Sequence, residues 1–177
     1  MEAITHILTG ILIQVLCFVF FPLPFNLILT IVLGFFSHFL IDALAKITYH
    51  TPAPHPEDKF WVAWHVITPL LVVVLIVWGI LINKLLFFLI GGISANLVDI
   101  WDWGILRPIQ SKKKKENPDT TWGEKYFIHD LIDKLRKGLF SWLPNLNHEK
   151  KGVIPETLLI IVLWILAWWS LGFLPSA

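Results

Sequence analysis

The stretch Ser37-His38-Phe39-Leu40-Ile41-Asp42 places an imidazole and a carboxylate four residues apart, inside an apolar segment that runs from Phe25 to about Lys46. Four residues make about one turn of an α-helix, so the two side chains share a face. An aspartate near the centre of a membrane-spanning helix costs about 2.5 to 3.5 kcal/mol, so it needs a compensating partner or function. A metal ion would satisfy both His38 and Asp42. The alternative is a hydrogen bond that only holds helices together.

The composition indicates an integral membrane protein. The chain has 177 residues, of which 56% are hydrophobic, a share too high for a soluble domain of this length. Its apolar runs have the length of membrane spans, at residues 3–21, 25–46, 60–82, 85–106 and 155–173. We therefore predict an all-α fold, a single polytopic membrane bundle of about five transmembrane helices that comprises residues 1–177.

The segment 107–154 is polar and basic, and we predict that it forms a cytoplasmic loop. Arg107-Pro108 is expected to close the fourth span, and Lys112–Lys115 to follow in the loop. The spacing of Thr121 and Glu124 is that of a capping box, which predicts a helix from about Trp122 to Lys137. Its apolar and charged residues fall on opposite faces, as expected for an interfacial amphipathic helix in the headgroup layer.

Five spans put the N-terminus, the loop 47–59 and the loop 107–154 on the same side of the membrane. Of the 14 lysines and arginines, all except Lys84 fall on that side. The positive-inside rule makes it cytoplasmic, with the C-terminus outside, in the cell (inner) membrane. The first span lacks a basic flank and a small-residue cleavage site, so we interpret it as a retained span and not as a signal peptide.

Several predicted spans carry ionisable side chains at one depth. With about 1.5 Å of rise per residue, these groups lie roughly 6 to 12 Å inside the cytoplasmic ends of their helices: His6, His38, Asp42, His65, Asp99 and Asp102. Independent hydrogen bonds have no reason to gather in one layer, whereas metal ligands must converge. The single cysteine, Cys17, excludes a cysteine-rich site, so nitrogen and carboxylate ligands would hold one or two divalent ions, zinc first and manganese or iron as alternatives.

Our predicted metal ligands are His6, His38, Asp42, His65, Asp99, Asp102 and His129. Each has an alternative role. Asp102 could pair with Arg107 or orient a ligand histidine, and His65 could face the membrane interface. His129 forms a second His-xxx-Asp pair with Asp133, which a solvated helix face explains equally well. Three loop histidines are left open as ligands: His50, His55 and His148.

Three blocks resemble the prokaryotic membrane-bound metal-dependent hydrolases: Thr5-His6-Ile7-Leu8-Thr9-Gly10, Ser37-His38-Phe39-Leu40-Ile41-Asp42-Ala43-Leu44 and Trp64-His65-Val66-Ile67. That family includes the LexA-regulated inner-membrane type and is similar to zinc-dependent phospholipase C. Asp99-Ile100-Trp101-Asp102 resembles its Asp-x-Asp block with one residue added. The order of the last two blocks is reversed here, and Trp-His replaces a Thr-His. The resemblance implies metal-dependent hydrolysis of a phosphoester, with the histidines and aspartates of these blocks as ligands.

We therefore expect a hydrolase that acts on a lipid or lipid-linked phosphoester at the cytoplasmic leaflet, with an aspartate of the pair Asp99 and Asp102 as the base and Asp102 as the first candidate. Lys112–Lys115 and Arg107 would attract an anionic headgroup. Membrane lipids are the expected partners. We expect no nucleic acid, the chain has no nucleotide-binding glycine loop, and the oligomeric state is open.

Two other function classes use the same side chains. A divalent-metal transporter would carry ions through the site, although the outer half offers only Gln14, Thr30 and small residues for a path. A haem protein would use two of the three histidines His6, His38 and His65 as axial ligands, but the clustered aspartates suit haem poorly.

Overall fold

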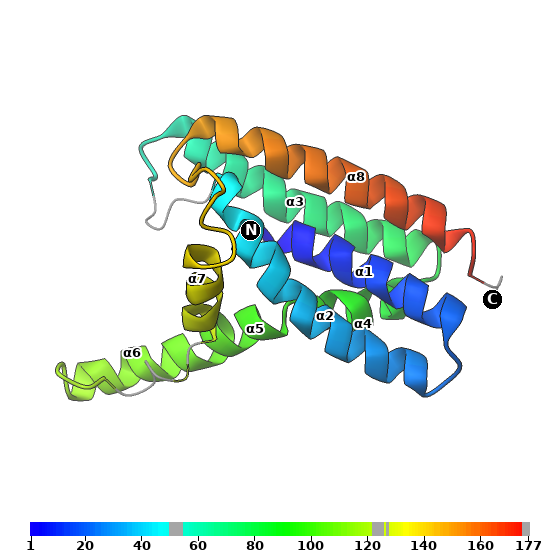
Figure 1. Ribbon diagram of the computed structural model, residues 1–177, viewed down its shortest axis with the longest axis horizontal. Coiled ribbons are helices and arrows are strands. Elements are labelled where there is room, and N and C mark those ends of the chain that lie inside the picture. The colour runs from blue at the N-terminus through cyan, green and yellow to red at the C-terminus, as the bar shows by residue number, and fades with distance from the viewer. Residues whose placement is uncertain (50–54, 122–125, 127, 175–177) are drawn as a thin grey trace.

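Four long helices form the body of the molecule (Figure 1). The computed structural model describes residues 1–49, 55–121, 126 and 128–174. The long helices are α1 (Ala3–Phe20), α2 (Phe25–Leu44), α3 (Lys59–Leu81) and α8 (Val153–Leu171). Each coincides with a predicted span to within two residues at either end. A short 3-10 turn, η1 (Ala45–Ile47), extends α2.

Helix α1 is the centre of the bundle and packs against α2, α4 (Leu85–Ala95) and α8. Its side chains Ile4, Leu8 and Ile11 are fully buried. Gly10 permits the closest approach, because a methyl group at this position would overlap the carbonyl oxygen of Gly91 on α4. Small residues at such crossings let helix backbones touch, which is how helices gain packing energy in a membrane.

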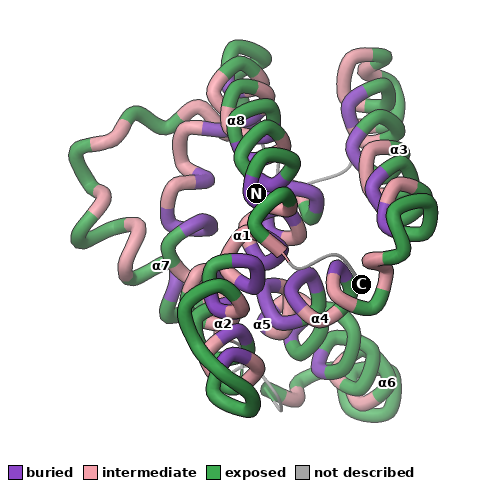
Figure 2. The backbone as a smooth tube through the Cα atoms, turned by 90° about the vertical axis from the view of Figure 1, so that its right-hand side faces the viewer, coloured by how far each residue is buried: buried purple, intermediate pink, exposed green. Residues whose placement is uncertain are grey.

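The outer surface of the bundle is apolar. On α3, for example, Leu70, Val73 and Ile80 are each more than half exposed. In Figure 2 the exposed parts of the tube lie on the outer sides of α3 and α8, while buried parts gather on α1. An apolar surface of this extent faces lipid and not water. The protein is therefore an all-helical membrane bundle, as predicted, with four helices long and apolar enough to cross a membrane and a fifth crossing if the bent helix pair is one span.

The fourth span is broken, whereas the sequence predicted an unbroken helix over 85–106. Helix α4 ends at Ala95, and the chain then bends by 63°. Asn96 follows the last turn, and its side-chain Nδ2 donates to the carbonyl oxygen of Gly92 at 2.8 Å. Side chains of this kind compete with the backbone ladder and favour a helix end. The bend leaves α4 with only 11 residues, about 16 Å of helix.

Beyond the bend the helix continues much further than predicted. Helix α5 (Leu97–Asp99), the π-helical segment η2 (Ile100–Leu106) and α6 (Arg107–Glu116) form one run, so Lys112–Lys115 lie on a helix and not in a loop. Proline normally stops a helix because it lacks an N–H group and crowds the carbonyl four residues earlier. Here the wider π turn relieves the crowding before Pro108: the backbone N–H of Arg107 donates to Asp102, five residues back.

Helix α7 (His129–Lys137) belongs to the predicted amphipathic helix. The expected start at Trp122 and the capping box with Glu124 lie outside the described residues. Ile132 of α7 is fully buried. Arg136 donates to the backbone carbonyl oxygen of Asp42 at 2.7 Å, which ties α7 to the C-terminal end of α2, where a positive charge is favourable. The N-terminus, α7 and η4 (Lys150–Gly152) all lie at one end of the bundle, which we call the loop-rich end (Figure 1).

Candidate metal centre

The last two turns of α2 contribute His38 and Asp42, both buried. The Nδ1 atom of His38 lies 2.8 Å from the carbonyl oxygen of Ala95, the last residue of α4. A carbonyl oxygen can only accept, so Nδ1 carries the proton and the Nε2 lone pair of the neutral ring is left available. The bend in the fourth span thus has a direct role, because it ends α4 where its terminal carbonyl can orient His38.

His129, the first residue of α7, is oriented in the same way by a carboxylate. Its Nδ1 lies 2.7 Å from Oδ2 of Asp102. Asp102 also accepts from the backbone N–H groups of His129 at 2.9 Å and Ile128 at 3.1 Å. With Nδ1 donating its proton to Asp102, the Nε2 atom of His129 faces Asp42 and Asp99. A histidine that donates to a carboxylate from one nitrogen is the usual arrangement of a metal-binding imidazole.

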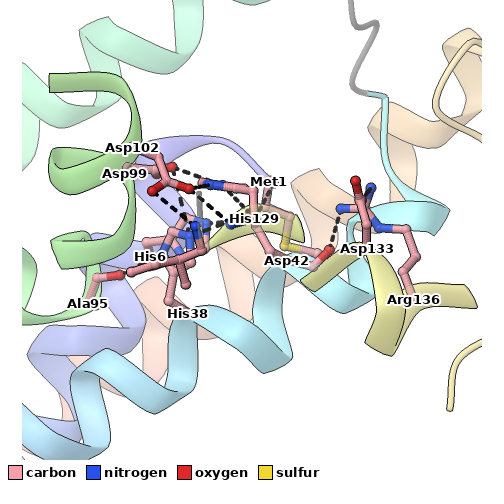
Figure 3. Close-up of polar contacts among 11 residues, drawn as sticks. Met1, His6, His38, Asp42, Ala95, Asp99, Asp102, His129, Asp133 and Arg136 are labelled. Atoms are coloured by element: carbon pink, nitrogen blue, oxygen red, sulfur yellow. Dashed lines mark hydrogen bonds and ion pairs between the residues drawn. The ribbon is translucent and has the colours of Figure 1, made fainter. Parts of the chain in front are cut away.

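Four ligand atoms converge at the loop-rich end (Figure 3). The Nε2 atom of His38 lies 3.4 Å from Oδ2 of Asp42 and 3.8 Å from Oδ1 of Asp99. The Nε2 atom of His129 lies 3.3 Å from each of the same two oxygens. A zinc ion with ligands at about 2.0 to 2.1 Å has tetrahedral ligand–ligand edges of about 3.3 to 3.4 Å. Three of the four separations match that edge.

The same distances argue against simple hydrogen bonds between the helices. An N–H···O bond spans about 2.7 to 3.2 Å and is shorter when a charge assists it. These four separations are longer, whereas His129 and Asp102 approach to 2.7 Å. The Nε2 atom of His38 is buried without a hydrogen-bond partner in the structure. An orphaned imidazole nitrogen beside two carboxylates fits a cation better than it fits an inter-helix hydrogen bond.

His6 supports this group from behind. Its Nε2 atom lies 3.1 Å from Oδ1 of Asp42, the oxygen that does not face His129, and its ring stacks on His38 with centroids 4.1 Å apart. The N-terminal nitrogen of Met1 lies 2.7 Å from the same oxygen. His6, His38 and Asp42 also form a triad in which one ligand atom from each lies within 4.8 Å of the others. We call His38, Asp42, Asp99 and His129 the four-residue site, and His6 positions its Asp42.

The open side of the centre is formed by Asp99 and His129, whose side chains are 33% and 27% exposed, against 8% for Asp42. His129 lies outside the long helices, at the start of α7. Burial alone would lower its pKa, but Asp42, Asp99 and Asp102 raise the pKa to about 10. Without a metal, the His129 ring is therefore an imidazolium at neutral pH, and a cation that binds there must displace its proton.

Of the seven predicted ligands, the structure brings six together and leaves His65 apart. The Nδ1 atom of His65 lies 2.8 Å from the carbonyl oxygen of Trp61, and its ring stacks on the Trp61 indole. The predicted partner of His129, Asp133, instead pairs with Arg136 at 3.2 Å. Among the loop histidines, His55 approaches Glu57 and His148 is exposed, while His50 lies outside the described residues.

Asp102 was predicted as a metal ligand and as the first candidate base, and the structure places it as in one of the stated alternatives, against a candidate ligand histidine. Its side chain is 1% exposed, and both carboxylate oxygens accept hydrogen bonds from His129 or Ile128. Its carboxylate is thus buried and directed at His129, whereas the Asp99 carboxylate is 33% exposed. The backbone carbonyl of Ala95 was missed by the sequence analysis, because a helix-ending carbonyl has no side-chain signature.

In comparisons with protein families, curated proteins and solved structures, nothing matches this chain.

Proposed function

We propose that this protein is a membrane-embedded, metal-dependent hydrolase that acts on lipid or lipid-linked phosphoesters at the cytoplasmic leaflet. The observation that carries the proposal is that ligand atoms of His38, Asp99 and His129 lie within 4.8 Å of one another, with Oδ2 of Asp42 3.4 Å from His38 and 3.3 Å from His129. When bound, a divalent metal supplies Lewis-acid polarisation of a phosphoryl oxygen and a water of lowered pKa. The resemblance of the His6, His38 and Asp99 blocks to membrane-bound hydrolases agrees with this chemistry.

The residues divide the work by their positions. His38, Asp42 and His129 hold the ion, while Ala95 and Asp102 fix the two imidazoles. With these three ligands, the fourth position of a zinc ion is left for water. Asp99 is the most exposed carboxylate of the site, so we assign the general base to it in place of Asp102. The site lies at the loop-rich end of the bundle. This position favours a substrate whose reacting group lies near the lipid headgroups.

Cationic residues lie on α6, the helix that follows the π-helical segment of Asp102. Arg107, Lys114 and Lys115 line a hollow on this helix together with Gln110 and Ser111. Such a surface attracts anionic headgroups over about a Debye length. The excess of basic residues at the loop-rich end supports a cytoplasmic location for the site and for the N-terminus, in a cell membrane.

The test measures phosphoester turnover by zinc-loaded protein on phosphatidic acid, a polyprenyl phosphate and a phospholipid. Asp99→Asn should lower kcat strongly, since it removes the base, whereas replacement of Lys112–Lys115 by alanine should raise KM and weaken the salt dependence while the metal content stays unchanged. Absence of turnover on all three substrates, with the metal bound, would sink the hydrolase proposal.

A divalent-metal transporter is the second candidate. Gln14 favours it, because this fully buried side chain lies on α1 beyond the site and neither of its amide atoms has a hydrogen-bond partner. An unsatisfied amide in a membrane helix is a candidate ligand on an ion path. Zinc uptake into proteoliposomes that is lost in Gln14→Leu, combined with no phosphoester turnover, would replace the hydrolase by the transporter.

A further inference from the structure

An apolar groove runs along the bundle and ends at Asn96 and Ile100, close in sequence to Asp99 of the candidate metal centre. It has a volume of about 300 Å³ and is lined by α1, α3 and α4 and by the first residues after the bend. On α4 the lining extends from Leu85 to Gly92 and Ile93, and it closes at Asn96 and Ile100. Ile100 directly follows Asp99, whose carboxylate belongs to the four-residue site.

The groove exists because α1 and α4 pack closely while α3 stands off from them. Gly92 leaves its floor open, since a methyl group there would lie 3.1 Å from Ile7 of α1. The floor is formed by buried side chains such as Leu75 and Phe88. Ile76, Leu89 and Ile93 form the rim and are 41% to 50% exposed. The groove therefore opens sideways into the lipid phase along its length.

We infer that this groove holds one hydrocarbon chain of the lipid phosphoester whose headgroup reaches Asp99. The inference rests on the proposed function, and it adds a site for the tail of the substrate. Of the twelve lining residues, Asn96 alone has a polar side chain, and it lies at the end nearest to the metal centre. The groove is thus apolar at its Leu85 end and polar at its Asn96 end, which matches the tail and the head of a lipid.

Length and width both favour a single chain over a helix. Helix α4 spans about 16 Å along the groove, close to the thickness of one leaflet in a hydrocarbon core of about 30 Å. An α-helix is about 10 Å wide, so a helix of a partner protein or of a second copy of this chain would lie across the groove and insert only side chains. An extended hydrocarbon chain can lie within the groove along its whole length.

Tail binding in a membrane differs from tail binding in water. Lipid tails are as apolar as the groove, so burial provides no hydrophobic gain and only packing and orientation favour the bound chain. The expected role is therefore to hold the headgroup at Asp99, with a moderate effect on KM. Lipid that coats the whole apolar surface without preference is the competing explanation.

The first experiment maps where a tail binds and does not depend on turnover. A hexadecyl phosphate that carries a photoreactive diazirine near the chain end is irradiated with the zinc-loaded protein in lipid nanodiscs, and labelled residues are identified by mass spectrometry. We expect labels concentrated at the Leu85 and Phe88 end of the groove, and their loss with excess unlabelled hexadecyl phosphate. Labels spread evenly over all lipid-facing helices would overturn the groove.

A matched pair of variants then tests the link to catalysis. Val72 lines the groove, whereas its neighbour Val73 does not line it and is 53% exposed to lipid. Val72→Phe should raise KM for a sixteen-carbon phosphoester about fivefold relative to a four-carbon one, and Val73→Phe should leave that ratio unchanged. The metal content of both variants reports whether each has folded around an intact site.

The outcomes separate the two proposals. Turnover with an unchanged ratio in Val72→Phe and no labelling of the groove would remove the tail site and leave the hydrolase. Groove labelling without turnover on any phosphoester would remove the hydrolase and leave the tail site. If Val72→Phe fails to bind metal, the labelling of the unaltered protein decides alone.

Discussion

At the scale of single residues, the centre depends on how the two histidine rings are held. Asp102 fixes His129 through a 2.7 Å hydrogen bond to Nδ1. Asp102→Asn should weaken zinc binding by about 10- to 100-fold without abolishing it, because the ligand remains but its orientation and basicity suffer. A competition titration with a zinc chelator measures this. Asp133→Asn is the matched control, since Asp133 pairs only with Arg136 in the described part of the chain. Equal affinities for the two variants would contradict the assigned role.

The proton on His129 gives a second test. The carboxylates around His129 raise its pKa to about 10, so zinc must expel that proton at neutral pH. We expect about one proton released for each zinc bound at pH 7.5, measured by zinc titration in weakly buffered solution. Affinity should rise with pH, about tenfold per unit, until the pH approaches the pKa. Proton release that is unchanged in His129→Ala would show that the ion binds elsewhere.

The ligand residues show which part of the site a sequence can predict. His38 and Asp42 can be predicted because helical spacing places them on one face. The aspartates of the fourth span can be predicted because they lie at a matching depth in the membrane. The depth of a residue in the membrane does not show which way its side chain points around the helix axis. For this reason His65 was among the predicted ligands, although its side chain turns toward Trp61. The partnership of His129 with Asp102 spans 27 positions across a loop, and local spacing suggested Asp133 instead.

At the scale of helices, the crossing of α1 and α4 positions the whole site. Gly10 and Gly91 let the two backbones touch, and this contact sets His6 against α2 and Ala95 against His38. Gly10→Ala should cost about 1 to 3 kcal/mol of stability and reduce zinc occupancy, because the helices must separate. Thermal unfolding in detergent together with bound-zinc analysis tests this.

Gly104→Ala is the control for that change. A methyl group at Gly104 would meet its nearest neighbour, a side-chain carbon of Ile100, at 4.0 Å, which is an ordinary contact. We expect no loss of stability or of zinc there. If Gly104→Ala and Gly10→Ala have equal effects, the crossing is not the element that holds the site.

The bend and the long helix after it mark the limit of sequence analysis at this scale. Hydrophobic runs predicted the bounds of α1, α2, α3 and α8, because each of these helices is apolar along almost its whole length. No proline lies at the helix break at Asn96, and the apolar pattern of the sequence continues across the break. Pro108 suggested a helix end, yet a π turn absorbs it. Both features depend on backbone hydrogen bonds that apolar periodicity does not record.

At the scale of the whole molecule, the charges predict the orientation. Lys84 is the one basic residue placed away from the loop-rich end in the predicted topology, so we expect the N-terminus and α6 in the cytoplasm and the C-terminus outside. Reporter fusions at residues 116 and 177 measure this. A cytoplasmic C-terminus would mean that α4 enters and leaves on one side as a re-entrant segment, because its 11 residues are too short to span alone.

The central claim is that one divalent ion binds among His38, Asp42, Asp99 and His129. The most direct test is the metal content of the purified protein after zinc loading and removal of excess ion, with His38→Ala and His65→Ala prepared in parallel. We predict about one tightly bound zinc per chain in the unaltered protein and in His65→Ala, and almost none in His38→Ala. Of these two histidines, His38 supplies a ligand atom to the site and His65 does not. Retention of full zinc by His38→Ala, or equal loss in both variants, would contradict this account.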